Sequence, residues 1–193
     1  MLRSDQYDLI YLISRKPGGI VHEKIHEIII DFEQIEQLNL DNPVGEAFCT
    51  LGTTMRQAGS REKFQKVDLE YVTSFARLAK TSGAAKFLVI SSMGANPKSA
   101  VFYNRIKGLA EEGLQNLGFK HLIILRPSLL LGKRPEPRLG ERMGAIFMKV
   151  FNFLIPDNYK AIEASRVAEK LLEMAYKANE GVTVVESGEM IGN

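Results

Sequence analysis

Short apolar runs rich in β-branched residues alternate along the chain with longer stretches whose apolar residues recur at helical spacing. The strand-like runs span residues 8–14, 26–31, 46–50, 86–91, 121–126 and 182–185. Each run is nearly continuous in apolar residues, as expected of parallel strands that are buried on both faces. The alternation predicts an α/β fold, a parallel sheet with right-handed crossovers.

The stretches between these runs predict the helices. In residues 61–81, apolar side chains recur every three or four positions, and Ser82 and Gly83 provide the stop. Further helices are expected at 100–117, at 142–153 before Pro156, and at 166–178 after a cap at Ser165.

Length and composition suit one soluble domain over residues 1–193, within which 132–181 forms a small substrate-side region. The 25 basic and 23 acidic residues are spread along the chain, so no basic stripe for nucleic acid is expected. The single cysteine, Cys49, is interpreted as a small core residue, and the three histidines are scattered. These features predict no metal site and no disulfide.

The chain shows no pattern that directs it to a membrane or out of the cell. Residues 1–10 lack the layout of a signal peptide, and the longest apolar region, residues 145–155, is too short to span a bilayer. We therefore expect a cytoplasmic protein that acts on a small molecule without contacting nucleic acid or membrane. Whether it forms an oligomer stays open.

In a parallel α/β sheet, the chemistry lies beyond the carboxyl ends of the strands. The polar, small and aromatic residues that follow the predicted strands are therefore candidates for a binding site. They are Ser14, Arg15, Asp31, Phe32, Leu51, Gly52, Thr53, Thr54, Ser91, Ser92, Arg126, Pro127 and Ser128.

One stretch carries a recognisable catalytic pattern. Ser92 follows a buried strand, and Tyr103 and Lys107 lie four residues apart on the next predicted helix, on one face. A free phenol is a poor base at neutral pH, and an ammonium one turn away favours its phenolate form. A serine hydroxyl facing the phenol would orient a substrate oxygen. The pattern predicts acid–base chemistry on a carbonyl or alcohol, although an isolated Tyr–Lys pair is more often a surface tyrosine packed on a lysine stem.

Other residues at this edge are candidates for holding a nicotinamide cofactor. Arg15 and Lys16 follow the first strand and suit the 2′-phosphate of NADP, with NAD possible; the alternative is a solvated basic turn. The small residues Leu51, Gly52 and Thr53 form a turn that a cofactor can approach. Arg126 is expected to brace a loop over the nicotinamide, with Pro127 and Leu129 lining it.

Three blocks of sequence in fixed order resemble the atypical short-chain dehydrogenase/reductases, in the branch of Tat-interactive-protein-like NAD(P)-binding oxidoreductases and their bacterial relatives. They are residues 48–68, 91–108 and 124–134. The resemblance implies a Rossmann fold, NADP binding and a catalytic triad on Ser92, Tyr103 and Lys107. Nucleotide contacts would fall on Arg15, Leu51, Gly52, Tyr103, Lys107 and Leu129.

The chain departs from this family at its start. Family members open with a strand and a glycine-rich turn, and no GxGxxG or GxxGxxG occurs in this sequence. The missing strand would lie in the middle of the sheet, between the runs 8–14 and 46–50, and its turn would hold the pyrophosphate. Three explanations are open: a misassigned start codon, a degraded relative that binds cofactor weakly, or pairing of the two orphan edges with each other or with another chain.

The sequence leaves three functions open. The leading one is an NADP-dependent oxidoreductase of an unknown small carbonyl or alcohol. The second is a non-catalytic nucleotide sensor or interaction protein of the same fold, and the third is a structural remnant that binds nothing.

Overall fold

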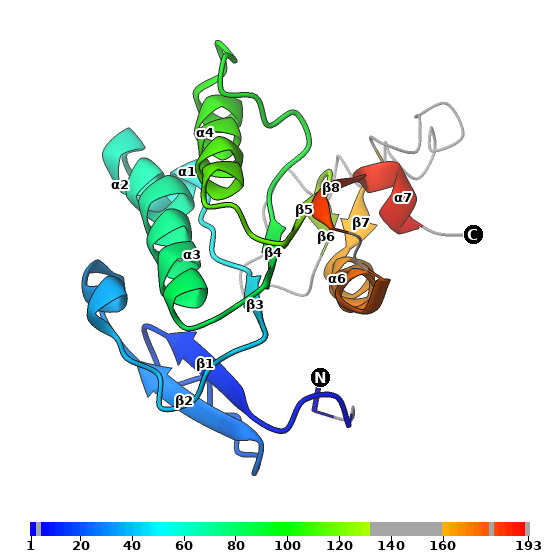
Figure 1. Cartoon of the computed structure of the whole chain (residues 1–193). Helices are drawn as coiled ribbons and strands as arrows, with labels where there is room; N and C mark the ends of the chain where they lie inside the picture. Colours follow the sequence, from blue (N-terminus) through cyan, green and yellow to red (C-terminus); the bar gives the residue numbers. More distant parts are fainter. Residues whose placement is uncertain (3–4, 132–159, 178–179, 192–193) are drawn as a thin grey trace.

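The computed structural model describes residues 1–2, 5–131, 160–177 and 180–191 (Figure 1). Its strands are β1 (Ile10–Ser14), β2 (Ile25–Ile29), β3 (Glu46–Cys49), β4 (Lys86–Ile90), β5 (His121–Arg126), β6 (Leu130–Leu131), β7 (Ile162–Glu163) and β8 (Gly181–Glu186). Its helices are η1 (Phe32–Gln37), α1 (Met55–Ala58), α2 (Arg61–Gln65), η2 (Lys66–Tyr71), α3 (Val72–Thr81), α4 (Phe102–Asn116), α6 (Ala164–Lys177) and α7 (Ser187–Ile191).

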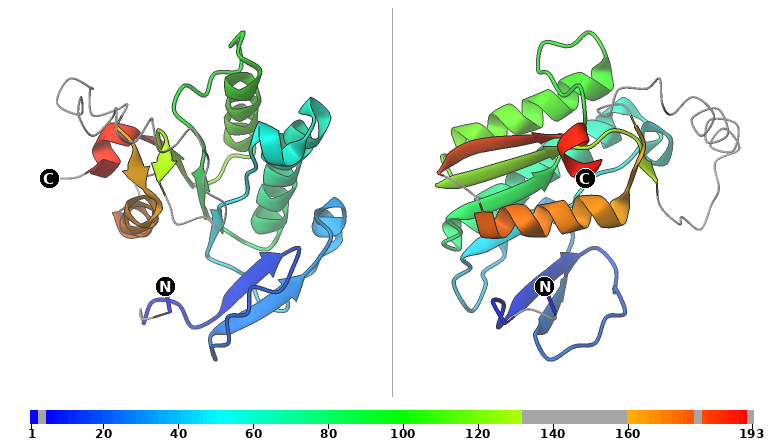
Figure 2. Two further views of the ribbon diagram at one scale, coloured as in Figure 1. Left: turned by 180° about the vertical axis from the view of Figure 1, so that it is seen from behind. Right: turned by 90° about the vertical axis from the view of Figure 1, so that its right-hand side faces the viewer.

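The centre of the molecule is a four-stranded parallel sheet in the order β3-β4-β5-β8. Side chains of β4 and β5 alternate between two apolar cores. Phe87 and Val89 pack toward α3 and α4, whereas Leu88 packs on the opposite face, toward α6. Helices therefore cover both faces of the sheet, as Figures 1 and 2 show. This two-sided burial explains why the strands read as continuous apolar runs, and it confirms the predicted Rossmann-like α/β fold.

The predicted helix over residues 61–81 forms, but it is not α-helical throughout. Its middle, η2, is a π-helix, with α2 before it and α3 after it. The helical path ends at Ser82, and Gly83 has a φ of 99°, as predicted for the stop. A π-helical turn places one extra residue in the turn and changes which side chains face the core.

The two N-terminal strands form a sheet of their own. β1 and β2 pair in parallel, and β1 does not pair with β3, so the structure does not show the direct pairing of the two orphan edges. A cavity of about 920 Å³ lies between the residues of β1 and those of β3. The sheet is therefore interrupted at the position where the family's first strand is expected.

Some boundaries differ from the sequence prediction. Ser165 does not cap α6, because the helix already begins at Ala164 and includes Ser165 in its first turn. The short elements η1, α1, β6, β7 and α7 were not predicted, since none is long enough to show a periodicity. The expected helix at 142–153 and most of the substrate-side region at 132–181 lie outside the described residues.

A glycine of α4 allows this helix to contact the loop that follows β4. A Cβ atom on Gly108 would lie 2.2 Å from the carbonyl carbon of Asn96 and from the nitrogen of Pro97. The same loop is held by a hydrogen bond from the Asn96 amide to the Asn104 carbonyl, at 3.0 Å. The loop carrying Ser92 and the helix carrying Tyr103 are thus packed backbone against backbone.

This contact makes Gly108 a sensitive position. We expect Gly108→Ala to lower the free energy of unfolding by about 2 kcal/mol, because the new methyl group forces helix and loop apart. Gly113→Ala is the matched control on the same helix, since its Cβ would meet only the Thr73 side chain at 3.7 Å. That change should stabilise the protein by about 0.5–1 kcal/mol through helix propensity. Urea unfolding measures both, and equal effects would contradict the close packing at Gly108.

Candidate active site

Helix α4 carries Tyr103, Lys107 and Glu111 at successive spacings of four residues, which places the three side chains on one helix face. Lys107 and Glu111 are buried, with 6% and 3% of their surface exposed. Tyr103 is half-buried, and its ring centre lies 5.3 Å from that of Phe64 in α2. This face of α4 therefore carries a phenol, an ammonium and a carboxylate, each one helical turn from the next.

Lys107 forms a buried ion pair with Asp68 of the π-helix η2. The Lys107 Nζ lies 2.7 Å from the Asp68 Oδ1, and the two side chains are 8% and 0% exposed. Removing both charges from water carries a large desolvation penalty, so a partner lost from such a pair leaves an uncompensated charge. The pair therefore holds the Lys107 ammonium in one place.

The other oxygen of Asp68 holds the turn that follows β3. The Thr53 amide donates a hydrogen bond to the Asp68 Oδ2 at 2.8 Å. A Cβ on Gly52 would lie 3.4 Å from Asp68 Oδ1 and 3.7 Å from Lys107 Nζ, so the backbone of this turn runs directly over the ion pair. Asp68 thus connects the predicted cofactor turn to the predicted catalytic lysine.

A second buried carboxylate, Glu111, organises the ends of β4 and β5. It accepts hydrogen bonds from the Ser91 hydroxyl and from Nε and Nη2 of Arg126, the latter two at 3.0 and 2.6 Å. Arg126 also donates to Glu186 at 3.1 Å. Hydrogen bonding to Glu111, and then to Glu186, raises the pKa of Arg126 above its usual value. The Arg126 guanidinium, which was expected to brace a loop over the nicotinamide, forms ion pairs with Glu111 and Glu186. The predicted contact with a loop over a nicotinamide stays a prediction.

Ser92 lies in the loop between β4 and α4 and is half-buried. Its hydroxyl faces the Met93 carbonyl at 3.4 Å, and the Met93 amide donates to the Pro127 carbonyl at 2.9 Å. No hydrogen bond among the described residues joins Ser92, Tyr103 and Lys107. Tyr103 and Lys107 lie on one face of α4, and the loop that carries Ser92 packs against that helix. The catalytic triad of these three residues stays a prediction.

The remaining cofactor candidates have different surroundings. Arg15 and Lys16 are exposed just after β1, where the Ser14 hydroxyl donates to the Lys16 carbonyl at 2.7 Å. Asp31 is exposed and caps η1, whereas Phe32 is buried and packs on Tyr71 with ring centres 5.7 Å apart.

Three further candidates lie next to the Asp68–Lys107 pair or beside the end of β5. Leu51 is half-buried against the apolar core, Pro127 is buried, and Leu129 is 50% exposed. Contacts of these residues with a nucleotide stay predictions.

Cys49 lies in the core, as expected from the sequence. It is 1% exposed, and burial raises the pKa of its thiol to about 11, so a thiolate nucleophile is absent at neutral pH. Within the described ranges, no group of three metal-ligating side chains comes together. The described helices include none with the length and apolar character needed to cross a bilayer.

The sequence prediction missed both buried carboxylates of this site, Glu111 and Asp68, and only Asp68 had a signal that could have found it. Asp68 lies four residues after Phe64 and four before Val72, both of which are buried. An acidic residue between two core positions of a helix is a signal for a buried charge with a partner. The signal was available, but nothing in the sequence identified Lys107 as that partner.

Comparison with known proteins shows the family of this chain. The chain is 36% identical over 153 residues to HTATIP2 of Rattus norvegicus, a match covering 76% of this chain and 62% of the relative. It is 38% identical over 135 residues to FMP52 of Candida albicans, covering 67% of this chain and 58% of that protein. The chain belongs to the family of HTATIP2 and FMP52, the atypical short-chain dehydrogenase/reductases. Both matches span less than two thirds of the relatives' own length.

Solved structures support the same fold at low sequence identity. MoeE5 in complex with UDP-glucose and NAD superposes with a TM-score of 0.68 at 13% identity, covering 95% of this chain and 71% of MoeE5. The human epimerase family protein SDR39U1 with NADPH gives 0.59 at 14% identity, covering 91% of this chain and 65% of the human one. No protein-family model matches the chain.

One prediction is overturned by these relatives. The cytoplasmic location expected from the sequence is wrong by this comparison, because the fungal relatives of this short-chain dehydrogenase/reductase are named mitochondrial proteins. The absence of a signal-peptide layout does not separate cytoplasmic from mitochondrial proteins, since transit peptides follow different composition rules.

The Asp68–Lys107 pair can be tested by removing one charge. We expect Asp68→Asn to lower the free energy of unfolding by about 3–5 kcal/mol, because it leaves the buried ammonium unpaired. The Thr53 amide should also exchange its hydrogen faster, having lost a charged acceptor.

The control is Glu33→Gln, which breaks the exposed Glu33–Lys66 pair. It should leave the unfolding midpoint nearly unchanged. Denaturant unfolding and hydrogen exchange of both variants decide the matter, and similar small effects would show that Asp68 does not hold the site.

Proposed function

We propose that this chain is an NADP-dependent oxidoreductase that acts on a small carbonyl or alcohol. Membership of an NAD(P)-binding family supports the general class. The cofactor preference, the substrate class and the catalytic residues are the proposal's own content, and they rest on the chemistry of the described side chains.

The observation that carries the proposal is the buried Asp68–Lys107 pair beneath the Gly52–Thr53 turn. A charge pair this deeply buried is seldom the most stabilising use of two core positions. Here it fixes a cation next to a backbone turn without a side chain at Gly52, and one helical turn from Tyr103. In this position the Lys107 ammonium can bind the ribose hydroxyls of a cofactor, and the Tyr103 phenol lies beside the bound ribose.

The reaction assigns a separate task to each residue. A nicotinamide held beside Lys107 and Tyr103 would supply or accept the hydride at the substrate carbon. In the reducing direction, the Tyr103 hydroxyl donates its proton to the carbonyl oxygen, and the Lys107 ammonium stabilises the phenolate that results. The Ser92 hydroxyl donates a hydrogen bond that orients the same oxygen. This requires the Ser92 side chain to rotate away from the Met93 carbonyl.

The preference for NADP rests on Arg15 and Lys16. Both are exposed at the carboxyl end of β1, where the adenosine ribose of a dinucleotide binds in this fold. A guanidinium binds a phosphate in a bidentate manner and gains little from a neutral ribose hydroxyl. The solved neighbours include complexes with NAD and with NADPH, so either cofactor is compatible with the fold.

Replacing the phenol tests the catalytic assignment. We expect Tyr103→Phe to lower kcat by about 10²–10⁴-fold, because the general acid is lost while the ring is kept. The dissociation constant of NADPH should remain nearly unchanged. Tyr176→Phe on α6 is the control and should keep full activity.

The assay follows NADPH oxidation over a panel of aldehydes and ketones, with nucleotide binding measured by fluorescence. Full activity of Tyr103→Phe would refute the role of Tyr103. If the wild-type protein oxidises NADPH with none of the compounds but binds it, the reductase proposal gives way to the sensor described below.

Cofactor preference is tested by removing the guanidinium at position 15. We expect Arg15→Ala to raise the dissociation constant of NADPH by at least about tenfold and to leave that of NADH unchanged, since a charge-assisted hydrogen bond contributes about 1.5–3 kcal/mol. Lys120→Ala is the control, because Lys120 lies just before β5, at the amino end of that strand, whereas Arg15 follows the carboxyl end of β1. Equal loss of both cofactors would mean that Arg15 does not contact the 2′-phosphate.

A nucleotide sensor without turnover is the second candidate function. It is favoured by the position of the Ser92 hydroxyl, which faces the Met93 carbonyl at 3.4 Å and, among the described residues, forms no hydrogen bond with Tyr103 or Lys107. Thermal melting with NADPH also tests the third possibility, because a ligand that prefers the folded state raises the melting temperature. No shift at millimolar cofactor would support a protein that binds no nucleotide.

A further inference from the structure

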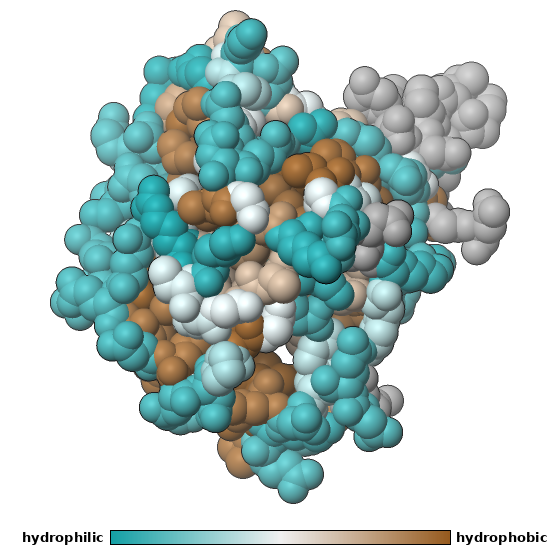
Figure 3. All heavy atoms as spheres, in the orientation of Figure 1, coloured by the Kyte–Doolittle hydropathy of each residue, from teal (hydrophilic) through white to brown (hydrophobic). Residues whose placement is uncertain are grey.

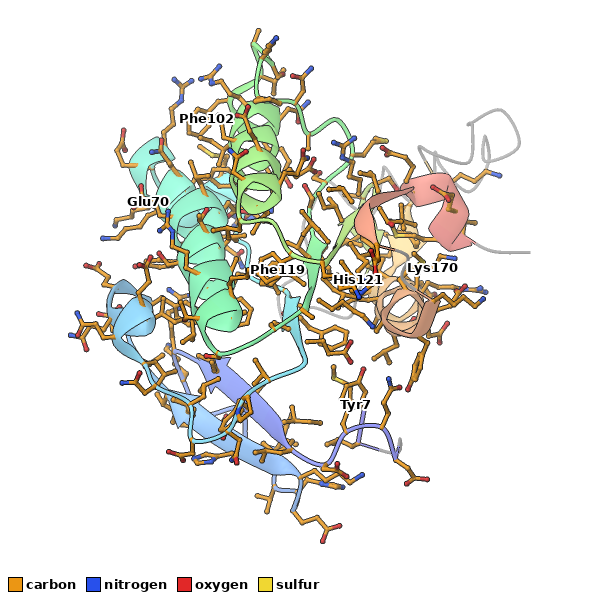
Figure 4. The ribbon with its side chains drawn as sticks, viewed as in Figure 1. Tyr7, Glu70, Phe102, Phe119, His121 and Lys170 are labelled. Carbon is orange, nitrogen blue, oxygen red and sulfur yellow. The ribbon has the colours of Figure 1, made fainter. Side chains whose placement is uncertain are left out.

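Positive charge gathers on the surface around the start of α4. Arg61 of α2 and Arg105 of α4 both lie over the Phe102 ring, with their guanidinium carbons 5.2 and 5.7 Å from the ring centre. Lys98 and Val101 are exposed in the loop that leads into α4. We call these five residues the arginine patch. In Figure 3, a small hydrophobic area enclosed by hydrophilic surface lies near the top of the molecule, where Figure 4 labels Phe102.

Contacts within the protein hold both guanidinium groups in position. The aromatic ring attracts each cation, and Nη1 of Arg105 also donates a hydrogen bond to the Ser99 carbonyl at 3.0 Å. The Phe102 ring is itself packed on Phe64, with ring centres 6.0 Å apart. A guanidinium that stacks on a ring keeps N–H groups at its edge for an anion. Because these side chains are already ordered, binding costs them little further entropy.

No carboxylate among the described residues pairs with either guanidinium. Glu62 is next to Arg61 in sequence, but it accepts a hydrogen bond from Ser60 at the start of α2 and forms no ion pair with Arg61. The guanidinium carbons of Arg61 and Arg105 lie within about 11 Å of each other, the sum of their distances from the ring centre. Two like charges this close repel each other, and salt screens them only in part. An anionic partner that contacts both would relieve this repulsion.

The composition of the arginine patch favours a protein partner over a small molecule. Arginine and aromatic side chains are enriched at the centres of protein–protein interfaces. Val101, which is 57% exposed, adds apolar surface that a free phosphate or carboxylate would leave uncovered. Small molecules bind mainly in concave sites, and no residue of the patch lines the cavity of about 920 Å³. The charge of the patch requires acidic residues on the partner.

We propose that the arginine patch binds an acidic segment of a partner protein. Two carboxylates of the segment, one helical turn apart or two positions apart along a strand, form charge-assisted hydrogen bonds with Arg61 and Arg105. An apolar side chain of the segment covers Val101, and the Lys98 ammonium attracts the same segment. None of these residues belongs to the proposed catalytic or cofactor site, so the proposal does not rest on the proposed function.

The test measures binding of a designed peptide to the full chain. The probe is a fluorescein-labelled peptide of about twelve residues, rich in glutamate and leucine, with glycine and serine between them. A second peptide has glutamine in place of each glutamate and is otherwise identical. Fluorescence anisotropy at low salt gives the dissociation constants, with and without NADPH. Hydrogen exchange shows where the peptide lies.

We expect saturable binding of the acidic peptide and at least about tenfold weaker binding of the glutamine peptide, because charge-assisted hydrogen bonds are lost. Arg61→Gln and Arg105→Gln should each raise the dissociation constant of the acidic peptide by about tenfold. The amides of residues 99–105 should gain protection. NADPH should leave the binding unchanged.

The matched control is Arg77→Gln on α3. It removes the same charge from an exposed arginine, but Arg77 lies outside the patch and already pairs with Glu36 at 2.8 Å. This variant should bind the acidic peptide as the wild type does.

Four results would overturn the proposal. One is no binding of the acidic peptide, and another is equal binding of both peptides, which would mean apolar adsorption. A third is an equal loss of binding in all three variants, which would mean that the peptide responds to net charge alone. The last is displacement of the peptide by inorganic phosphate at a concentration near the peptide's dissociation constant, which would assign the patch to a small anion.

Discussion

The buried ion pair between Asp68 and Lys107 is the interaction on which the site depends. It connects the π-helix η2, helix α4 and the turn after β3, three elements that are far apart in sequence. Because each charge is withdrawn from water, each tolerates only a narrow range of positions before its partner is lost. Elements joined in this way keep a fixed spacing, which a site that binds a dinucleotide and a substrate together requires.

The second carboxylate of α4, Glu111, extends the same principle to the next strands. Together with Arg126 and Ser91 it ties the ends of β4 and β5 to the helix that carries Tyr103. The close contact at Gly108 adds a steric constraint between that helix and the loop of Ser92. A buried polar network stabilises a fold only when each of its members has a hydrogen-bond partner. These few residues therefore determine how the helix and the carboxyl ends of the strands are positioned.

The region between β1 and β3 is held together differently. A cavity of about 920 Å³ separates these two strands, and among the described residues no strand pairs with both of them. The carboxyl ends of β3, β4 and β5 do not depend on contacts across this cavity, because they are held by their own ion pairs and by helices on both faces of the sheet.

The sequence by itself determined the fold class and most element positions, because continuous apolar runs and helical periodicity follow directly from two-sided burial. The runs at 86–91 and 121–126 became β4 and β5 almost residue for residue, and Tyr103 and Lys107 could be placed on one helix face by spacing alone. Only the tertiary structure decided that Lys107 pairs with Asp68, that Arg126 serves Glu111 and Glu186, and that β1 and β3 remain apart. These outcomes depend on which distant segments meet, and local patterns of hydropathy contain no information about the partner of a buried charge or of a free strand edge.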